Sequence, residues 1–339
     1  MKELTGHKEL KSGLFKVSEN TFTAFAFKLF EFQYEQNPIY RQFCQAIGKH
    51  PVGIDSIEQI AFLPIQFFKT KEITTGVFEP KAIFESSGTT GQATSKHIIK
   101  DTAIYEESFL RCFTSRYGDV SKYCIVALLP SYLDRKNSSL VYMVKELIAR
   151  SKDPQSEFYL NDVEKLHRTL LENEKAGKQT LLIGVTYALL DFFQRYPMSL
   201  NHTIIMETGG MKGRAKEFTR NEVHSQLMKQ SGVNAIHAEY GMTELLSQAY
   251  AEKNGIFRSP PWMKVFVREE DDPFCIRSAN NGSELTGAIN IIDLANIYSC
   301  SFIATDDMGK LYTDGSFEVL GRLDNSDIRG CSLLLDNVY

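Results

Sequence analysis

The amino-acid sequence predicts an α/β fold, with layered, mostly parallel sheets covered by helices and a β-rich closing subdomain. Strand-like apolar runs alternate with helix-like stretches between residues 123 and 238, and this alternation is typical of parallel sheets. Beyond Lys264, turn signals such as Asn280-Asn281-Gly282 separate strand-like runs, which favours short strands joined by turns. The 339 residues, of which 43% are hydrophobic, are enough to bury a large core.

The expected helices and strands follow one another in chain order. Residues 20–47 are rich in aromatic residues and helix formers, so we expect one or two helices that pack through an aromatic face. The elements expected next are a strand over 123–129, a helix over 138–150, a strand over 179–183, a helix over 185–195, a strand over 203–206, a helix over 213–230 and a strand over 234–238. Ligands bind at the carboxyl ends of such strands.

No linker, repeat or low-complexity tract divides the chain. We therefore expect a single domain over residues 1–339. Within it we expect a helical part over 1–80, an α/β core over 81–260 and a β-rich subdomain over 261–339.

Charge and cysteine content exclude several classes of protein. A net charge of -4 and the lack of a basic run argue against a nucleic-acid partner. The six cysteines lack the spacing of a zinc site and are expected to be free thiols. The longest apolar run, 181–190, is too short to span a bilayer, and the N-terminus lacks the apolar core of a signal peptide. We expect a cytoplasmic protein that is not an integral membrane protein.

The loop Ser86-Ser87-Gly88-Thr89-Thr90-Gly91 has the composition of a phosphate cradle. Hydroxyl groups and backbone N–H groups can converge on one anion there, and the glycines permit positive φ angles. The loop is not a Walker motif, because Gln92 stands where that motif has lysine, and it lacks the third glycine of the dinucleotide fingerprint.

Further motifs supply other groups that bind nucleotides. Tyr240-Gly241-Met242-Thr243-Glu244 follows a strand-like segment and offers an aromatic face, a hydroxyl and a carboxylate. Farther along the chain lie Thr305-Asp306-Asp307-Met308-Gly309, Gly321-Arg322-Leu323-Asp324 and Ile328-Arg329-Gly330.

In type, order and spacing these motifs, which span residues 86–330, resemble those of the adenylate-forming superfamily of acyl- and aryl-CoA ligases, luciferases and peptide-synthetase adenylation domains. The chain more closely resembles the acyl-protein synthetase branch, the LuxE-like long-chain-fatty-acid protein ligases of bacterial luminescence. This resemblance rests on the segment Leu63–Lys69, on Glu207-Thr208-Gly209-Gly210 and on a chain end close after Arg329-Gly330-Cys331.

The resemblance implies the fold of an adenylate-forming N-terminal domain, with residues 81–260 as the nucleotide-binding core. Nine residues follow Gly330, so the mobile C-terminal domain of the superfamily is expected to be absent. The implied enzyme is an AMP-forming ligase that uses ATP and Mg²⁺ to activate a fatty acid or another carboxylic acid. It would pass the acyl group to a protein thiol, with an acyl-CoA reductase-like protein or an acyl carrier as a partner.

The resemblance also assigns roles around the phosphates. The loop of residues 86–91 would hold the β- and γ-phosphates, with Lys96 and His97 nearby, although the Pro-Lys pair common after this loop in the superfamily is absent. Thr243 would contact the α-phosphate and Glu244 would hold Mg²⁺, because carboxylates beside substrate phosphates are usual magnesium ligands. The alternatives are a surface turn for the loop and a helix-start carboxylate for Glu244.

For the nucleoside, Tyr240 would stack on adenine. Gly209 and Gly210 would let the backbone approach the base, and Gly241 would bind the nucleotide as part of the same motif as Tyr240. The alternatives are a core tyrosine and ordinary turn glycines.

Asp307 would accept both ribose hydroxyls, because a carboxylate can accept two hydrogen bonds at once, with Asp306 as the fallback. Arg322 would bind ribose or the α-phosphate. A solvated acidic turn and a surface ion pair are the alternatives.

Cys331 would be the thiol that takes the acyl group from the adenylate, by resemblance to the cysteine near the C-terminus of acyl-protein synthetases. In an extended segment Arg329 would lie on the same face and lower the thiol pKa. The alternative is a small buried hydrophobic residue.

Two other functions stay open. One is an acyl- or aryl-CoA ligase of the phenylacetate-CoA ligase type, in which CoA would raise turnover. The other is a nucleotide-binding scaffold that has lost its chemistry and works within an acyl-processing complex.

Overall fold

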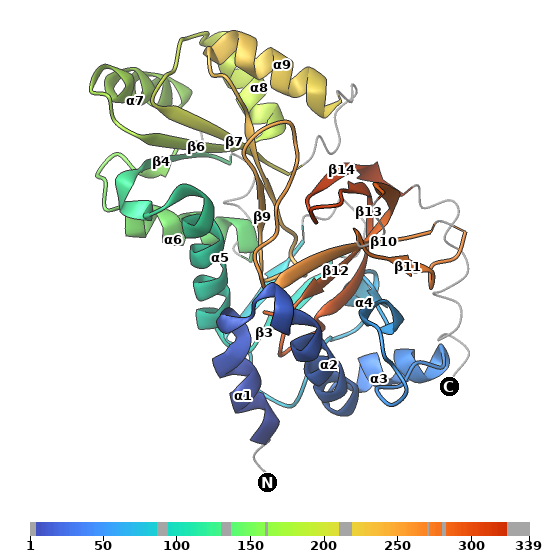
Figure 1. The fold of residues 1–339 in the computed structure, drawn as a ribbon. Helices are drawn as coiled ribbons and strands as arrows, with labels where there is room; N and C mark the ends of the chain where they lie inside the picture. The colour runs from blue at the N-terminus through green and yellow to red at the C-terminus, as the bar shows by residue number, and fades with distance from the viewer. Residues whose placement is uncertain are drawn as a thin grey trace. The chain divides into compact units, whose positions relative to one another are not determined.

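The structure is a computed structural model that describes residues 5–86, 94–129, 137–159, 162–209, 219–269, 271–279 and 283–323 (Figure 1). The chain forms two compact units. The first unit comprises residues 1–108, 243–247 and 259–339, and the second comprises residues 109–242 and 248–258. The boundary between the two units falls within the motif Tyr240–Glu244, directly after Met242. The parts predicted over 1–80, 81–260 and 261–339 stay predictions.

A six-stranded sheet in the order β5-β4-β6-β7-β8-β9 forms the centre of the second unit. Its strands are β4 (Cys124–Leu128), β5 (Glu157–Phe158), β6 (Thr180–Val185), β7 (Thr203–Thr208), β8 (His237–Tyr240) and β9 (Ala249–Ala251). All neighbours are parallel except β8 and β9. β4 and β6 are buried at every position, because helices cover both faces of a parallel sheet.

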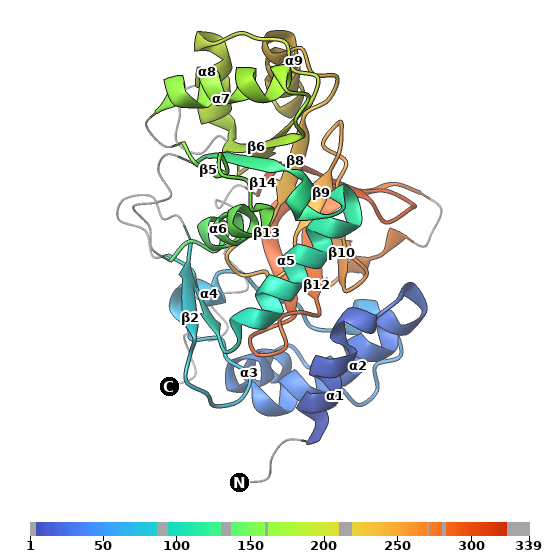
Figure 2. The same ribbon diagram turned by 90° about the vertical axis from the view of Figure 1, so that its left-hand side faces the viewer.

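Helices cover this sheet on both sides. They are α6 (Ser139–Ser151), α7 (Val163–Lys175), α8 (Thr186–Arg195) and α9 (Arg220–Ser231). Figures 1 and 2 show α7, α8 and α9 on one side of the sheet and α6 on the other. The helix predicted from residue 213 begins at Arg220, because Thr219 is its extended N-cap and forms a capping box with Glu222. Residues 213–218 lie outside the described residues.

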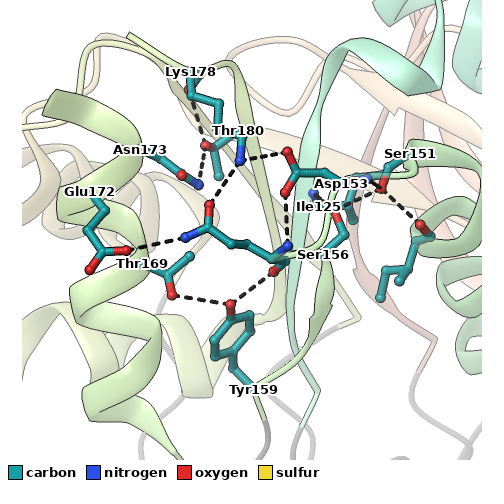
Figure 3. A network of polar contacts seen from close by, with 12 residues as sticks. Ile125, Ser151, Asp153, Ser156, Tyr159, Thr169, Glu172, Asn173, Lys178 and Thr180 are labelled. Atoms are coloured by element: carbon teal, nitrogen blue, oxygen red, sulfur yellow. Dashed lines mark hydrogen bonds and ion pairs between the residues drawn. The ribbon is translucent and has the colours of Figure 1, made fainter. Parts of the chain in front are cut away.

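A polar network fixes the connections near the amino ends of β4 and β6 (Figure 3). Lys178 Nζ lies 2.6 Å from Asp153 Oδ2 and 2.9 Å from Gln155 Oε1. Ser156 Oγ accepts a hydrogen bond from Ile125 N–H at 2.8 Å, and Tyr159 donates to the Gln155 carbonyl at 2.9 Å. These contacts lie opposite the carboxyl ends of the strands, the edge at which parallel sheets bind ligands, so their role is structural.

The first unit contains a second six-stranded sheet, with the order β1-β13-β12-β10-β11 and with β14 paired to β13. The strands are β1 (Leu63–Pro64), β10 (Met263–Arg268), β11 (Ile276–Arg277), β12 (Leu285–Asp293), β13 (Phe302–Leu311) and β14 (Phe317–Arg322). Only β1 and β13 are parallel among the pairs of this sheet in the described residues. The strands predicted beyond Lys264 are present, but β12 and β13, with nine and ten residues, are longer than the short strands predicted.

The remaining elements of the first unit are α1 (Thr5–Gly13), α2 (Glu19–Gln36), α3 (Pro38–Ala46), α4 (Phe67–Thr70) and the hairpin of β2 (Ala82–Glu85) and β3 (Lys96–Ile99). Short 3-10 helices span Leu14–Lys16 and Ile57–Gln59, and a third, Val120–Lys122, lies in the second unit. α5 (Thr102–Tyr117) begins in the first unit and ends in the second.

Where one or two helices were predicted within residues 20–47, the structure has two, α2 and α3. Asn37 separates them, because it caps α3 by accepting a hydrogen bond from Tyr40 N–H at 3.0 Å, and Pro38 starts the helix. Part of the aromatic face forms core: Phe22, Phe30 and Tyr40 are buried, and the Tyr40 ring stacks on Phe302 with centroids 5.8 Å apart. No helix among the described residues is long and apolar enough to cross a membrane.

Candidate functional site

The base of the predicted phosphate loop is closed by backbone and side-chain hydrogen bonds in the first unit. Ser86 N–H donates to the Ser95 carbonyl at 3.0 Å, and Ser95 N–H donates to Ser86 Oγ at 2.9 Å. The two strands of the hairpin therefore fix both ends of the loop. The predicted loop residues Ser87, Gly88, Thr89, Thr90 and Gly91 lie outside the described residues.

The two basic residues after this loop face different surroundings. Lys96 is exposed and lies opposite Glu85 in the hairpin. His97 is 1% exposed; its Nδ1 lies 2.8 Å from the Thr243 carbonyl, and its Nε2 lies 2.8 Å from Ser299 Oγ. Because a carbonyl only accepts, Nδ1 is the donor and Nε2 accepts from Ser299. Burial lowers the pKa of His97 to about 4, so the neutral ring ties β3 to Thr243 and supplies no charge to a phosphate.

The turn that carries Thr243 and Glu244 is held by buried polar side chains of the first unit. Glu244 is 5% exposed, and its carbonyl accepts a hydrogen bond from Asn296 Nδ2 at 2.8 Å. Asp293 Oδ2 accepts from Leu246 N–H and Ser247 N–H at 2.8 and 3.0 Å. Burial raises the pKa of Asp293, although hydrogen bonds from Ser247 and Leu246 oppose the shift.

Glu244 is suited to Mg²⁺ because it is a buried carboxylate on this fixed turn. Magnesium is usually held by one or two carboxylates together with substrate phosphates. The described residues contain no group of three or more His, Cys, Asp or Glu side chains that could hold a metal ion.

Asp307 and Arg322 lie opposite each other on β13 and β14 of the first unit. Arg322 Nε is 3.4 Å from Asp307 Oδ1. The preceding residue, Asp306, lies on the opposite face of β13, where its carboxylate accepts a hydrogen bond from Gln66 Nε2 of the segment Leu63–Lys69. The strand thus separates the two candidate carboxylates, and Asp307 is the one beside Arg322.

In the second unit, two predicted residues end neighbouring parallel strands. Gly209 follows β7 with φ +73°, and its carbonyl accepts a hydrogen bond from Thr186 Oγ1 at 3.0 Å. Tyr240 ends β8 and is 8% exposed. At Gly241 a Cβ atom would lie 2.5 Å from Glu239 Oε1, so a side chain there would require the Glu239 carboxylate to shift. Gly210, from the same group of predicted residues, lies outside the described residues.

Two buried carboxylates support these strand ends. Glu207 on β7 contacts Thr186 Oγ1 and His224 Nε2, each at 2.9 Å. Glu239 on β8 accepts from Thr208 Oγ1 at 2.5 Å, and burial raises its pKa to about 7.

Sequence reasoning assigned no role to Glu239, Asp293 or Asn296, and it named Glu207 only as part of a motif. The sequence does hint at both glutamates, because Glu207 belongs to the motif with the glycine pair and Glu239 stands directly before Tyr240. No motif marks Asp293 or Asn296, because their partners lie far away in the sequence. Cys331, the predicted acyl acceptor, lies outside the described residues.

The chain shares its fold with solved structures of adenylate-forming enzymes. Over 73% of its length the chain matches ATP-bound MatB from Rhodopseudomonas palustris, with a TM-score of 0.54, 16% identity and 49% of that protein covered. It matches O-succinylbenzoate coenzyme A synthetase from Bacillus subtilis in complex with AMP over 72% of its length, with a TM-score of 0.50, 15% identity and 50% of that protein covered. The chain thus spans about half the length of these solved structures.

The profile of the acyl-protein synthetase family, LuxE, matches residues 15–339. A long-chain-fatty-acid–luciferin-component ligase from Vibrio harveyi is 23% identical over an alignment of 337 residues. The alignment covers 91% of this chain and 86% of that protein. The chain belongs to the LuxE acyl-protein synthetase family. The predicted family, the adenylate-forming α/β fold and the prediction of an ATP-dependent acid ligase are confirmed.

Proposed function

We propose that this protein activates a long-chain fatty acid with ATP as acyl-AMP and then transfers the acyl group to a protein thiol. The observation that carries the proposal is the family match over residues 15–339, which spans all the predicted site residues. The Vibrio harveyi relative, whose name specifies a long-chain fatty acid, supports the choice of substrate.

In the first step a carboxylate oxygen of the fatty acid attacks the α-phosphorus of ATP, and pyrophosphate leaves with the electron pair of the broken P–O bond. Residues 86–91 bind the β- and γ-phosphates in this proposal, and Thr243 binds the α-phosphate. Glu244 would hold Mg²⁺, which neutralises phosphate charge when bound. The fixed turn around Glu244 supports this role, because preorganised groups need no rearrangement during the reaction.

Other side chains bind the nucleoside and assist at the phosphates. Asp307 accepts the ribose hydroxyls, and Arg322 binds ribose or the α-phosphate. Lys96 lies near the phosphates on the first strand after the loop. Adenine packs against Tyr240, with close backbone approach at Gly209, Gly210 and Gly241.

In the second step a thiolate sulfur attacks the acyl carbonyl carbon, a thioester forms and AMP leaves. We propose Cys331 as this thiol, with an acyl-CoA reductase-like protein or an acyl carrier as the later acceptor. The described cysteines, Cys44, Cys112, Cys124, Cys275 and Cys300, are free thiols, which supports the proposal of a reducing, cytoplasmic setting.

Fatty-acid-dependent exchange of labelled pyrophosphate into ATP tests the proposal. The expected result is exchange that needs both Mg²⁺ and a long-chain fatty acid and that does not rise when CoA is added. Turnover that depends on CoA would instead indicate a CoA ligase, and ATP binding without exchange would indicate a scaffold.

A further inference from the structure

Arg220, the first residue of α9, lies between a carboxylate and an aromatic ring in the second unit. Its Nε is 3.4 Å from Glu207 Oε1, and its guanidinium lies over the Phe257 ring, 5.2 Å from the ring centroid. The Glu207 side chain is 9% exposed and Phe257 is 1% exposed. A planar guanidinium held by a carboxylate and by a ring has little freedom, because the contacts restrain its edge and its face.

Each of the two partners of Arg220 is linked to a different residue of the proposed adenine site. Glu207 stands two residues before Gly209, and Thr186 Oγ1 lies 2.9 Å from Glu207 Oε2 and 3.0 Å from the Gly209 carbonyl. Phe257 packs against Tyr240, with ring centroids 5.7 Å apart and an interplanar angle of 55°. One side chain thus supports both the turn after β7 and the ring at the end of β8.

Residues around Arg220 fit its position beside Glu207 and Phe257. Gly255 has φ +65°, and a Cβ atom there would lie 2.5 Å from Arg220 Cδ. His224, one helical turn after Arg220, lies 2.9 Å from Glu207 Oε1. Burial would raise the pKa of Glu207, but the His224 hydrogen bond and the charges of His224 and Arg220 lower it below its usual value. Glu207 therefore stays ionised as the partner of Arg220.

We propose that Arg220 is a positioning residue for nucleotide binding, which fixes the Tyr240 ring and the Gly209 turn in the conformation that accepts adenine. The inference rests on the proposed function, because it assumes that adenine packs there. Arg220 acts through Phe257 and Glu207 and does not contact the reacting atoms. Its loss should therefore weaken ATP binding and leave the chemical step and fatty acid binding largely unchanged.

Arg195 provides a matched control in the same unit. It lies 5.1 Å above the ring of Tyr196 and 3.4 Å from Glu164 Oε1. These distances are nearly the same as those of Arg220, although the side chains of Arg195 and Glu164, 62% and 65% exposed, are more exposed than those of Arg220 and Glu207, 30% and 9% exposed. Arg195 and its two partners are not among the proposed site residues. Arg195→Ala therefore controls for the loss of an arginine with these contacts, and an unchanged kcat in Arg220→Ala separates weaker ATP binding from a general loss of stability.

The experiment compares wild type with Arg220→Ala, Arg220→Lys and Arg195→Ala, in full-length protein. ATP binding is measured by calorimetry, and the KM values for ATP and fatty acid and kcat are measured by pyrophosphate release. We expect Arg220→Ala to raise the Kd and KM for ATP about tenfold, with kcat and the KM for fatty acid changed by less than about threefold. Arg220→Lys should recover part of the loss, and Arg195→Ala should match wild type.

Unchanged ATP affinity in Arg220→Ala, or an equal loss in Arg195→Ala, would overturn the inference. Should Arg220→Ala fail to fold, Phe257→Leu is the second variant. It keeps an apolar side chain at position 257 but removes the ring under Arg220, and it should raise the Kd for ATP in the same way. A wild-type protein that binds ATP but releases no pyrophosphate would contradict the proposed function alone, because the Kd values would still test the role of Arg220. No ATP binding by wild type would overturn both.

Discussion

At the scale of single residues, Asp307 and Arg322 differ in exposure, and we therefore expect different roles for them. The side chain of Asp307 is 10% exposed and that of Arg322 is 57% exposed. An ion pair with one solvated partner contributes little to stability, so the arginine can leave Asp307 at small cost and contact a bound nucleotide. The buried carboxylate, held within β13, would stay in place as the proposed acceptor for ribose.

Replacing Asp307 with Ala should weaken ATP binding by about 10- to 100-fold, because hydrogen bonds to a charged group contribute roughly 1.5–3 kcal/mol. Calorimetric titration with ATP measures this change. Asp306→Ala is the control, since the side chain of Asp306 lies on the other face of the strand and contacts Gln66. An Asp307→Ala protein that binds ATP as tightly as wild type would refute the ribose role.

Replacing Glu244 with Gln should lower the rate of pyrophosphate release at saturating substrates by about 10²- to 10³-fold, as for other preorganised electrostatic groups. Gln keeps the size of the side chain and removes its charge, so the turn held by Asn296 and Asp293 should persist. Rapid-quench measurement of pyrophosphate gives the rate. A decrease of less than about threefold would argue that Glu244 has only a structural role.

At the scale of elements, the parallel sheet was predicted best. Its strands are buried on both faces, so they are continuous apolar runs, which are easy to recognise in the sequence. α7 was not predicted, since its buried face is narrow and its two buried leucines, Leu166 and Leu170, lie among charged residues. The start of α9 was misplaced, although the capping box of Thr219 and Glu222 is readable in the sequence. Contacts between distant elements, such as His97 with Thr243, leave no local pattern.

The link between β3 and the Thr243 turn should make stability depend on pH through His97. Its pKa is lowered from 6.5 to about 4 by burial, so the unfolded chain binds more protons between these values. The stabilisation is present above pH 6.5 and is lost as pH falls toward 4. Between pH 7 and pH 5 the free energy of unfolding should fall by about 2 kcal/mol more in wild type than in His97→Gln.

Denaturant unfolding of both proteins at each pH measures this difference. The comparison between the two proteins is needed because Glu239, whose pKa burial raises to about 7, acts in the opposite direction. Its effect is common to both proteins and cancels in the difference. Parallel pH profiles for wild type and His97→Gln would show that His97 is not buried in its neutral form.

At the scale of the whole molecule, the chain divides its predicted motifs between two compact units. Residues 86–96, 243–247, 307 and 322 belong to the first unit, and Gly209 and Tyr240 belong to the second. The order of motifs along the chain identified the family, but the division after Met242 could not be predicted. It depends on buried partners such as Asp293 and His97, which hold the residues after Met242 in the first unit.

Replacing Cys331 with Ser should separate the two steps of the reaction across the whole chain. Adenylate formation, measured as fatty-acid-dependent pyrophosphate exchange, should stay within about threefold of wild type, because the thiol enters only the second step. Covalent acylation of the protein should disappear. Cys275→Ser is the control, since Cys275 is another free thiol. Acylation that persists in Cys331→Ser would place the acyl group elsewhere.

The most direct test of the central claim is incubation of the purified protein with Mg²⁺-ATP and a radiolabelled long-chain fatty acid, followed by denaturing electrophoresis without thiols. We predict label on the protein that requires ATP and is removed by neutral hydroxylamine, as expected for a thioester formed after adenylation. Pyrophosphate release with no label on the protein, across a range of fatty acid chain lengths, would contradict transfer to a thiol of this protein.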